Sequence, residues 1–178
     1  MLNPAEPAIL LVEDNPVDVM LMRRAFRELE FSYRLAVVGD GAQAIQYLNG
    51  EGPYAARAEF PFPNLLLLDL GLPHVDGFQV LRWLRSQKTL QHLPVIVLSG
   101  SSFSPDIKRA YAAGANSFLT KPSGLAELIG AMKGLTEYWL HRGPVPQASP
   151  ASAQNILKLP QPETDAPPGR AQSSGPLQ

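Results

Sequence analysis

The first 143 residues alternate five times between a short apolar run and a stretch in which apolar residues recur at helical spacing. Runs of this kind are typical of strands that are buried on both faces of a sheet. They predict strands at Ala8–Val12, Arg34–Val38, Leu65–Leu68, Pro94–Leu98 and Ser117–Thr120. Because strands and helices alternate, the pattern indicates an α/β fold: a doubly wound, five-stranded parallel sheet built in (βα)5 order.

Capping residues and apolar spacing mark where the helices begin and end. Asn15 and Asp40 are N-cap residues for the first two helices, and Asp76 precedes the third. In the last helix, apolar residues recur at alternating intervals of three and four positions, as one buried face requires. The predicted helices begin at Pro16, after Asp40 and at Gly77, and the last two span Pro105–Ala113 and about Leu125 to Leu140.

Prolines set the boundary of the folded domain. Eight of the 18 prolines fall within residues 144–178, a stretch that also has no aromatic residue. Proline lacks a backbone donor and fixes φ, so this stretch can form neither a helix nor a central strand. We expect a domain at residues 1–143 and a Pro-rich, disordered tail at residues 144–178. The apolar patch Ile156–Leu159 is either a docking peptide or part of an inert tail.

Composition and charge exclude several classes of protein. The chain has no cysteine, which excludes disulfide scaffolds, thiol nucleophiles and Cys-based zinc sites. Its 15 Lys and Arg residues against 16 Asp and Glu give a net charge of −1, so no basic face for nucleic acid is expected. No secretory signal or membrane-spanning run is visible. We therefore expect a cytoplasmic protein that binds neither nucleic acid nor membrane.

Polar side chains stand at the carboxyl ends of four predicted strands. Each alone has an ordinary explanation as a turn, a helix cap or a solvated side chain. In a parallel sheet, however, these ends meet at one edge, which is where such folds bind ligands. We therefore expect the following residues to cluster: Glu13, Asp14, Asp69, Ser99 and Lys121.

This cluster suits phosphoryl chemistry. Three carboxylates and one lysine carry a formal charge of −2, which the hard cation Mg²⁺ would neutralise. A metal ion beside an ammonium group makes a receptacle for a phosphoryl group. Because carboxylates are ordinarily ionised at neutral pH, Asp69 would not need a general base to act as a nucleophile. Lys121 would pair with one phosphoryl oxygen, and the Ser99 hydroxyl would donate to another.

Residues 8–141 resemble the receiver domain of two-component response regulators. The stretches that carry the resemblance are Ile9–Asn15, Leu68–Pro73, Asp76-Gly77, Pro94–Ser99, Gly114-Ala115 and Phe118–Pro122. The resemblance implies the CheY-like, flavodoxin-like receiver fold and makes Asp69 the phosphoacceptor. It also implies that Glu13, Asp14 and Asp69 hold Mg²⁺ together with the backbone carbonyl of Gly71. The acidic pair is Glu-Asp where many receivers have Asp-Asp.

The same resemblance implies a conformational switch. Ser99 would follow the phosphoryl group, and Phe118 would turn inward when that hydroxyl moves. Lys121 matches the phosphate-binding lysine, and the peptide bond between Lys121 and Pro122 is expected to be cis. Gly71 and Ser101 occupy the positions that tune dephosphorylation. Neither side chain can orient an attacking water, so we expect a long-lived phosphorylated state.

Within the family, the chain is similar to the small regulators paired with bacterial and cyanobacterial phytochrome kinases. This finer resemblance rests on Glu13–Asp18, Asp69–Pro73 and the aromatic end of the last helix. It implies a stand-alone response regulator whose partner is a sensor histidine kinase, a bacteriophytochrome in the finer interpretation. Tyr138 and Trp139 would form a homodimer face on the last helix, or Trp139 would only cap the core. Beyond self-phosphorylation and slow autodephosphorylation, no enzyme activity is expected.

Other functions would place their own requirements on the same residues. A phosphohydrolase with an aspartyl-phosphate intermediate would carry Asp-x-Asp after the first strand, where this chain has Glu13-Asp14-Asn15. A serine hydrolase would set Ser99 in a Gly-x-Ser-x-Gly motif, which is absent from the sequence. A pseudo-receiver adaptor would have no need of Asp69, Ser99 and Lys121 together. A phosphate sink or relay would use the same site and stays open.

Overall fold

A computed structural model describes residues 6–29 and 32–141 of the 178-residue chain. These residues belong to the compact unit formed by residues 1–147. The predicted tail at 144–178, with its apolar patch Ile156–Leu159, lies outside the described residues. Among the described residues, no helix is long and apolar enough to span a membrane.

The core of the fold is a five-stranded sheet in the order β2-β1-β3-β4-β5, and every neighbouring pair is parallel. The predicted fold class is therefore confirmed. All residues of the three inner strands are buried, because helices cover both faces of the sheet. The strands are β1 (Ala8–Val12), β2 (Arg34–Val38), β3 (Leu65–Asp69), β4 (Val95–Ser99) and β5 (Ser117–Thr120).

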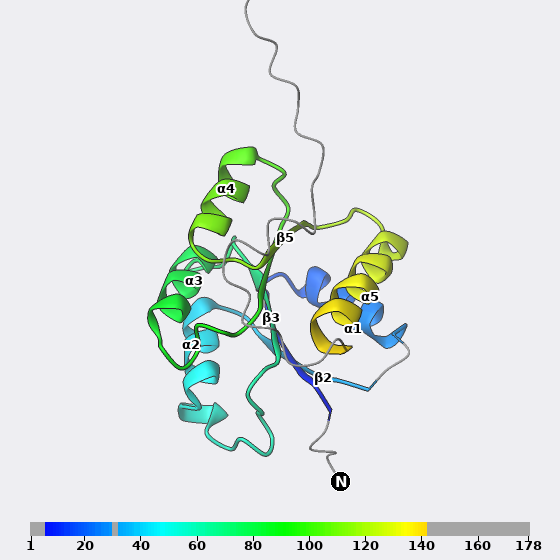
Figure 1. The fold of residues 1–178 in the computed structure, drawn as a ribbon. Coiled ribbons are helices and arrows are strands. Elements are labelled where there is room, and N and C mark those ends of the chain that lie inside the picture. The colour runs from blue at the N-terminus through cyan, green and yellow to red at the C-terminus, as the bar shows by residue number, and fades with distance from the viewer. Residues whose placement is uncertain (1–5, 30–31, 142–178) are drawn as a thin grey trace, which may run out of the picture. The chain divides into compact units, whose positions relative to one another are not determined.

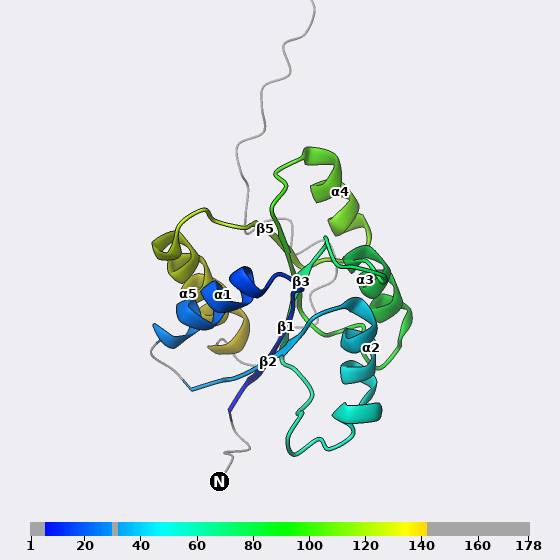
Figure 2. The same cartoon turned by 180° about the vertical axis from the view of Figure 1, so that it is seen from behind.

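Helices pack on the two faces of the sheet and enclose a separate hydrophobic core on each. Two of them, α1 and α5, lie on one face, and α2, α3 and α4 lie on the other (Figures 1 and 2). Phe26 and Met132 are fully buried in the first core, and Tyr47 and Leu81 in the second. The helices are α1 (Pro16–Arg27), α2 (Gly41–Asn49), α3 (Gly77–Ser86), α4 (Ser104–Ala112) and α5 (Leu125–His141), with a short 3-10 helix, η1, at Gly52–Tyr54.

The predicted capping residues are in place. The Asn15 side chain accepts a hydrogen bond from the Val17 amide at 2.9 Å, and Asp40 caps α2 in the same way. Asp76 forms a reciprocal capping box with Gln79 at the start of α3. These caps fix where α1 and α3 begin, after the loops that follow the carboxyl ends of β1 and β3.

Two strands extend one residue further than predicted. Parallel pairing continues to Asp69 in β3, which is in register with Leu98, and to Ser99 in β4, which is in register with Thr120. Both polar residues therefore lie on the last rung of the sheet rather than in the loops that follow. Pairing with the neighbouring strands holds the backbones of Asp69 and Ser99 in place, so the points from which their side chains extend are fixed.

Removal of the α2 cap should cost stability in a pH-dependent way. The Asp40 carboxylate accepts the Gln43 amide at 2.7 Å, and this bond holds the pKa of Asp40 below its ordinary value even though partial burial opposes it. Because the folded-state pKa is lowered, the ionised cap stabilises the protein above pH ~4 and this contribution fades at lower pH. We expect Asp40→Ala to lower the free energy of unfolding by about 1 kcal/mol at neutral pH. Urea denaturation at pH 7 and pH 3 checks this, and an equal difference at both would contradict it.

Candidate functional site

The carboxyl ends of β1 and β3 bring three acidic side chains together. Carboxylate oxygens of Glu13, Asp14 and Asp69 all lie within 4.8 Å of one another. Glu13 and Asp69 are buried, whereas Asp14 is exposed at the rim. The structure thus gathers the three carboxylates that the sequence placed at the ends of two different strands.

Lys121 directly follows β5, and its side chain extends into the acidic cluster. Its Nζ lies 2.6 Å from Glu13 Oε2, 2.8 Å from Asp18 Oδ2 and 3.0 Å from Asp69 Oδ2. An ammonium group has three N–H donors, so these contacts use all of them. Asp18, in the first turn of α1, was not among the predicted site residues. The sequence offers one signal for Asp18: it is an acidic residue in the first turn of a helix, and that helix begins close to Glu13.

Burial and charge change the proton affinities of this group. Burial raises the pKa of Glu13, and the hydrogen bond from Lys121 only partly offsets this effect. For Lys121, burial acts to lower the pKa, but the hydrogen bonds to Asp18, Glu13 and Asp69 together raise it. Lys121 is therefore held as a cation, and its charge compensates the buried carboxylates.

Backbone donors orient the acidic side chains. The Asn15 amide donates to Glu13 Oε1 and the Gly71 amide donates to Asp69 Oδ1, each at 3.2 Å. Each of these carboxylates therefore has a backbone donor on one oxygen and the Lys121 ammonium on the other. The Lys121 amide in turn donates to the Ser99 carbonyl at 2.7 Å, which ties the residue after β5 to the end of β4.

Comparison with known proteins agrees with this geometry. The family profile described as the response regulator receiver domain matches residues 9–133. The chain belongs to this family. Its relatives include "Probable methanogenesis regulatory protein FilR2" of Methanothrix harundinacea, which is 41% identical over 141 residues, 78% of this chain and 88% of FilR2.

Two further relatives of this receiver are cyanobacterial. Response regulator Rcp1 of Synechocystis is 34% identical over 146 residues, 82% of this chain and 97% of Rcp1. The crystal structure of Mn²⁺-bound Rcp1 matches with a TM-score of 0.69 over 79% of this chain and 99% of that one. The phosphorylated cyanobacterial phytochrome response regulator RcpA matches with a TM-score of 0.70 at 40% identity, over 76% of this chain and 95% of RcpA.

The predicted switch residues of this receiver lie on β4 and β5, the two strands that follow β3 in the sheet. Ser99 is buried, and its hydroxyl oxygen accepts the Ser101 amide at 3.1 Å. Phe118, on β5, is half-buried and packs against the core under α2, α3 and α4.

The aromatic pair at the end of α5 lies on the other face of the sheet. The side chain of Tyr138 is 39% exposed. Trp139 packs against the core under α1 and α5. This packing agrees with the alternative interpretation, in which Trp139 only caps the core. The two rings are 5.0 Å apart in an edge-to-face arrangement. Dimer formation through this face stays a prediction.

The predicted cis bond before Pro122 is wrong. Every peptide bond among the described residues of this receiver is trans. A bond before proline favours trans by about 0.5–1 kcal/mol unless its surroundings require otherwise. In the trans form Lys121 already reaches three carboxylates, so nothing in the observed site demands the cis form.

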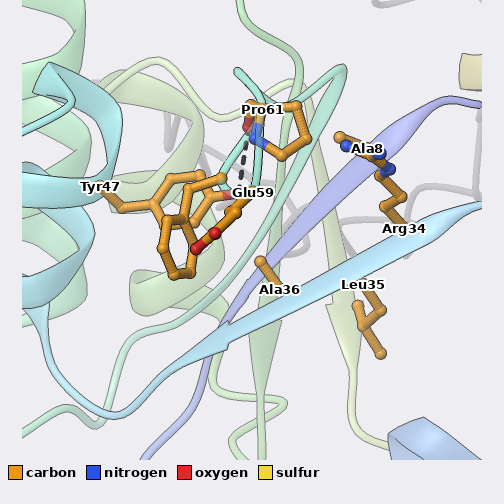
Figure 3. Close-up of a pocket in the computed structure, with 8 residues that line it drawn as sticks. Ala8, Arg34, Leu35, Ala36, Tyr47, Glu59 and Pro61 are labelled. Carbon is orange, nitrogen blue, oxygen red and sulfur yellow. Dashed lines mark hydrogen bonds between the residues drawn. The ribbon is translucent and has the colours of Figure 1, made fainter. Parts of the chain in front are cut away.

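A hollow elsewhere on the receiver is unrelated to this site. It has a volume of about 310 Å³ and lies at the amino ends of β1 and β2, beside Ala8 and Arg34. Tyr47 lines one side, and its hydroxyl donates to the Pro61 carbonyl at 3.0 Å (Figure 3). None of the predicted site residues lines it, and the acidic cluster with Lys121 lies at the opposite ends of the strands.

Proposed function

We propose that Asp69 accepts a phosphoryl group from the phosphohistidine of a partner sensor histidine kinase. An Asp69 carboxylate oxygen attacks phosphorus, the P–O bond forms, and the P–N bond breaks with its electron pair going to the histidine nitrogen. One observation carries the proposal: the buried Asp69 carboxylate has an ammonium 3.0 Å away and two further carboxylates within 4.8 Å. Phosphoryl transfer depends mainly on positioning and charge neutralisation of this kind.

The acidic side chains fit a divalent cation, and we propose Mg²⁺. Hard cations bind carboxylate and carbonyl oxygens, and here three carboxylates offer oxygens within 4.8 Å of one another. Glu13, Asp14 and Asp69 would hold the ion, together with the Gly71 carbonyl. When bound, the ion would supply positive charge to the oxygens of the transferring group.

Phosphorylation is proposed to act on binding partners through Ser99 and Phe118. The Ser99 side chain turns toward the phosphoryl group so that its hydroxyl donates to a phosphoryl oxygen, and this movement breaks the hydrogen bond that the hydroxyl oxygen accepts from the Ser101 amide. Phe118 then moves inward from its half-buried position on β5. The face formed by α4, β5 and α5 changes as a result, and with it the partner that binds there.

The proposed activity is confined to the protein itself. Gly71 has no side chain and Ser101 carries only a short hydroxyl, and this hydroxyl already contacts the Phe103 amide at 3.1 Å. Neither residue offers a carboxylate or amide to orient a water molecule toward the phosphoryl group. We therefore propose slow autodephosphorylation and no turnover of an external substrate.

We further propose that the kinase is a phytochrome. The similarity to the phytochrome response regulator RcpA supports this, since it extends over nearly all of that protein. The exposed Tyr138 beside Trp139 supports a homodimer through α5, because aromatic residues are enriched at interfaces. A phosphate sink or relay would use the same acceptor chemistry and would differ only in the next recipient of the phosphoryl group.

Mass spectrometry of the intact protein tests the acceptor chemistry. The full chain is incubated with acetyl phosphate and Mg²⁺, and in parallel with EDTA. We expect the mass to rise by one phosphoryl group only when Mg²⁺ is present. If the mass stays unchanged both with acetyl phosphate and with phosphorylated histidine kinases, phytochromes included, the proposed function is wrong.

A further inference from the structure

We infer that Asp18 is a positioning residue that holds the Lys121 ammonium beside Asp69 while the other two carboxylates change partners. The inference rests on the proposed function and deepens it. It starts from the observation that Lys121 Nζ donates to Glu13, Asp18 and Asp69, at 2.6, 2.8 and 3.0 Å. All three N–H groups are in use, so Lys121 can contact a phosphoryl oxygen only if one of these bonds is given up.

Two of the three carboxylates have other tasks in the proposed reaction. Glu13 is a candidate metal ligand, and its second oxygen also accepts the Asn15 amide. Asp69 becomes an acyl phosphate. The Lys121 ammonium, which donates to the Asp69 carboxylate before the transfer, then donates to oxygens of the new phosphoryl group. Neither carboxylate can hold the ammonium at a constant position before and after the transfer.

Asp18 is the remaining partner, and it is free of these tasks. It does not belong to the cluster of three carboxylates, and its side chain makes no other hydrogen bond to the described part of the chain. It projects from the first turn of α1, whose start is fixed by the Asn15 cap. A rigid helix end therefore carries the one carboxylate that can stay bound to Lys121 throughout.

The charge balance points to the same role. The four carboxylates of Glu13, Asp14, Asp18 and Asp69 against one ammonium give a formal charge of −3. Without an anchor of its own, the ammonium would be drawn toward the carboxylates at the metal site. Asp18 approaches Lys121 with a side chain that is 30% exposed, compared with 1% for Glu13 and 11% for Asp69. It thus holds the ammonium from the solvent side of the cluster.

The experiment compares the full-length wild type with Asp18→Asn, Asp18→Glu and Glu127→Gln. Asparagine at position 18 keeps the size of the side chain but removes its charge. Glutamate restores the charge on a side chain that is longer by one methylene group. Glu127 is also acidic and in the first turn of a helix, but it is exposed and forms no ion pair with Lys121. Each protein is also made in a Lys121→Met background, which completes a double-mutant cycle.

Two quantities are measured. The first is the rate constant of phosphorylation by acetyl phosphate with Mg²⁺, which we expect Asp18→Asn to lower about fivefold, the equivalent of a partly exposed ion pair of ~1 kcal/mol. Asp18→Glu should recover part of the rate, and Glu127→Gln should match the wild type. The second is the hydrogen exchange of the Lys121 ammonium, followed by ¹⁵N NMR, which should become faster in Asp18→Asn.

The outcomes separate this inference from the proposed function. A rate in Asp18→Asn that equals or exceeds that of the wild type overturns the inference, as does an equal loss in the Lys121→Met background, where Asp18 has no ammonium to hold. If none of the proteins, the wild type included, is phosphorylated either by acetyl phosphate or by a phosphorylated histidine kinase, the proposed function fails. Even then, an unchanged exchange rate of the Lys121 ammonium in Asp18→Asn would overturn the positioning role separately.

Discussion

An Asp69→Asn variant is expected to take up no phosphoryl group under conditions that modify the wild-type protein. The carboxamide has no ionised oxygen, so the nucleophile is lost although the size of the side chain is kept. In the wild type, one Asp69 oxygen accepts the Gly71 amide and the other accepts the Lys121 ammonium. Asparagine can accept only one of these donors, so we also expect a loss of about 1 kcal/mol in the free energy of unfolding. Mass spectrometry and urea denaturation measure the two effects.

Asp76→Asn is the matched control for this variant. Asp76 caps α3 through the Gln79 amide at 2.7 Å, and asparagine caps helices as well as aspartate does. The control should therefore keep both the phosphoryl uptake and the stability of the wild type. A phosphoryl group that still attaches to Asp69→Asn would contradict the assignment. Peptide mapping would then show whether Glu13 or Asp14 had accepted it.

The sheet could be predicted from the sequence because its inner strands are buried on both faces. Leu65–Leu68 is an unbroken apolar run, and burial of all four residues leaves no other element that fits so short a segment. The edge strands Arg34–Val38 and Ser117–Thr120 were also predicted with the bounds that the structure shows. The predicted ends of β3 and β4 each fall one residue short of the observed ends. The reason is that Asp69 and Ser99 are polar, although their backbones still pair within the sheet.

Long-range contacts between polar groups could not be predicted in this way. Asp18 and Lys121 are 103 residues apart, and nothing in the residues around Asp18 indicates its partner. The same is true of Arg85 on α3, which donates to the carbonyl oxygens of Gly114 and Leu93 at 2.8 and 3.0 Å. Hydrophobic periodicity reports which face of an element is buried. It carries no information about which distant polar atom a side chain meets.

The loop between α2 and β3 has internal structure that the hydrophobic pattern of the sequence does not indicate. Residues 52–54 form a turn of 3-10 helix. The rings of Tyr47, Tyr54 and Phe60 pack against one another in tilted and edge-to-face arrangements, with centroids 5.2 to 6.1 Å apart. Arg57 donates to the Tyr47 carbonyl at 2.8 Å and so satisfies the end of α2. Three aromatic residues in and beside a loop have no periodicity, so their cluster appears only once the chain is folded.

Gly77→Ala is expected to be strongly destabilising and to impair the acceptor site. Gly77 is the first residue of α3, and its amide donates to the Leu70 carbonyl at 3.3 Å. A Cβ atom at this position would overlap the Asp69 carbonyl oxygen and lie 2.8 Å from Leu70 Cα. Both atoms belong to the backbone, so neither can move aside without shifting α3 or the end of β3. We expect a loss of about 2–4 kcal/mol in the free energy of unfolding, and slower phosphorylation because the Asp69 backbone is displaced.

The same substitution in α5 should have the opposite sign. Gly130 lies on an exposed position in the interior of α5, and a Cβ there would meet no atom within 4 Å. Alanine is preferred over glycine inside helices by up to about 1 kcal/mol, so Gly130→Ala should raise the free energy of unfolding by about 0.5–1 kcal/mol. Urea denaturation of both variants checks the pair. Equal effects at the two positions would mean that the close approach of α3 to Asp69 is not what requires glycine at position 77. Opposite signs, with slower phosphorylation only in Gly77→Ala, would tie that glycine to the position of Asp69, the proposed phosphoacceptor.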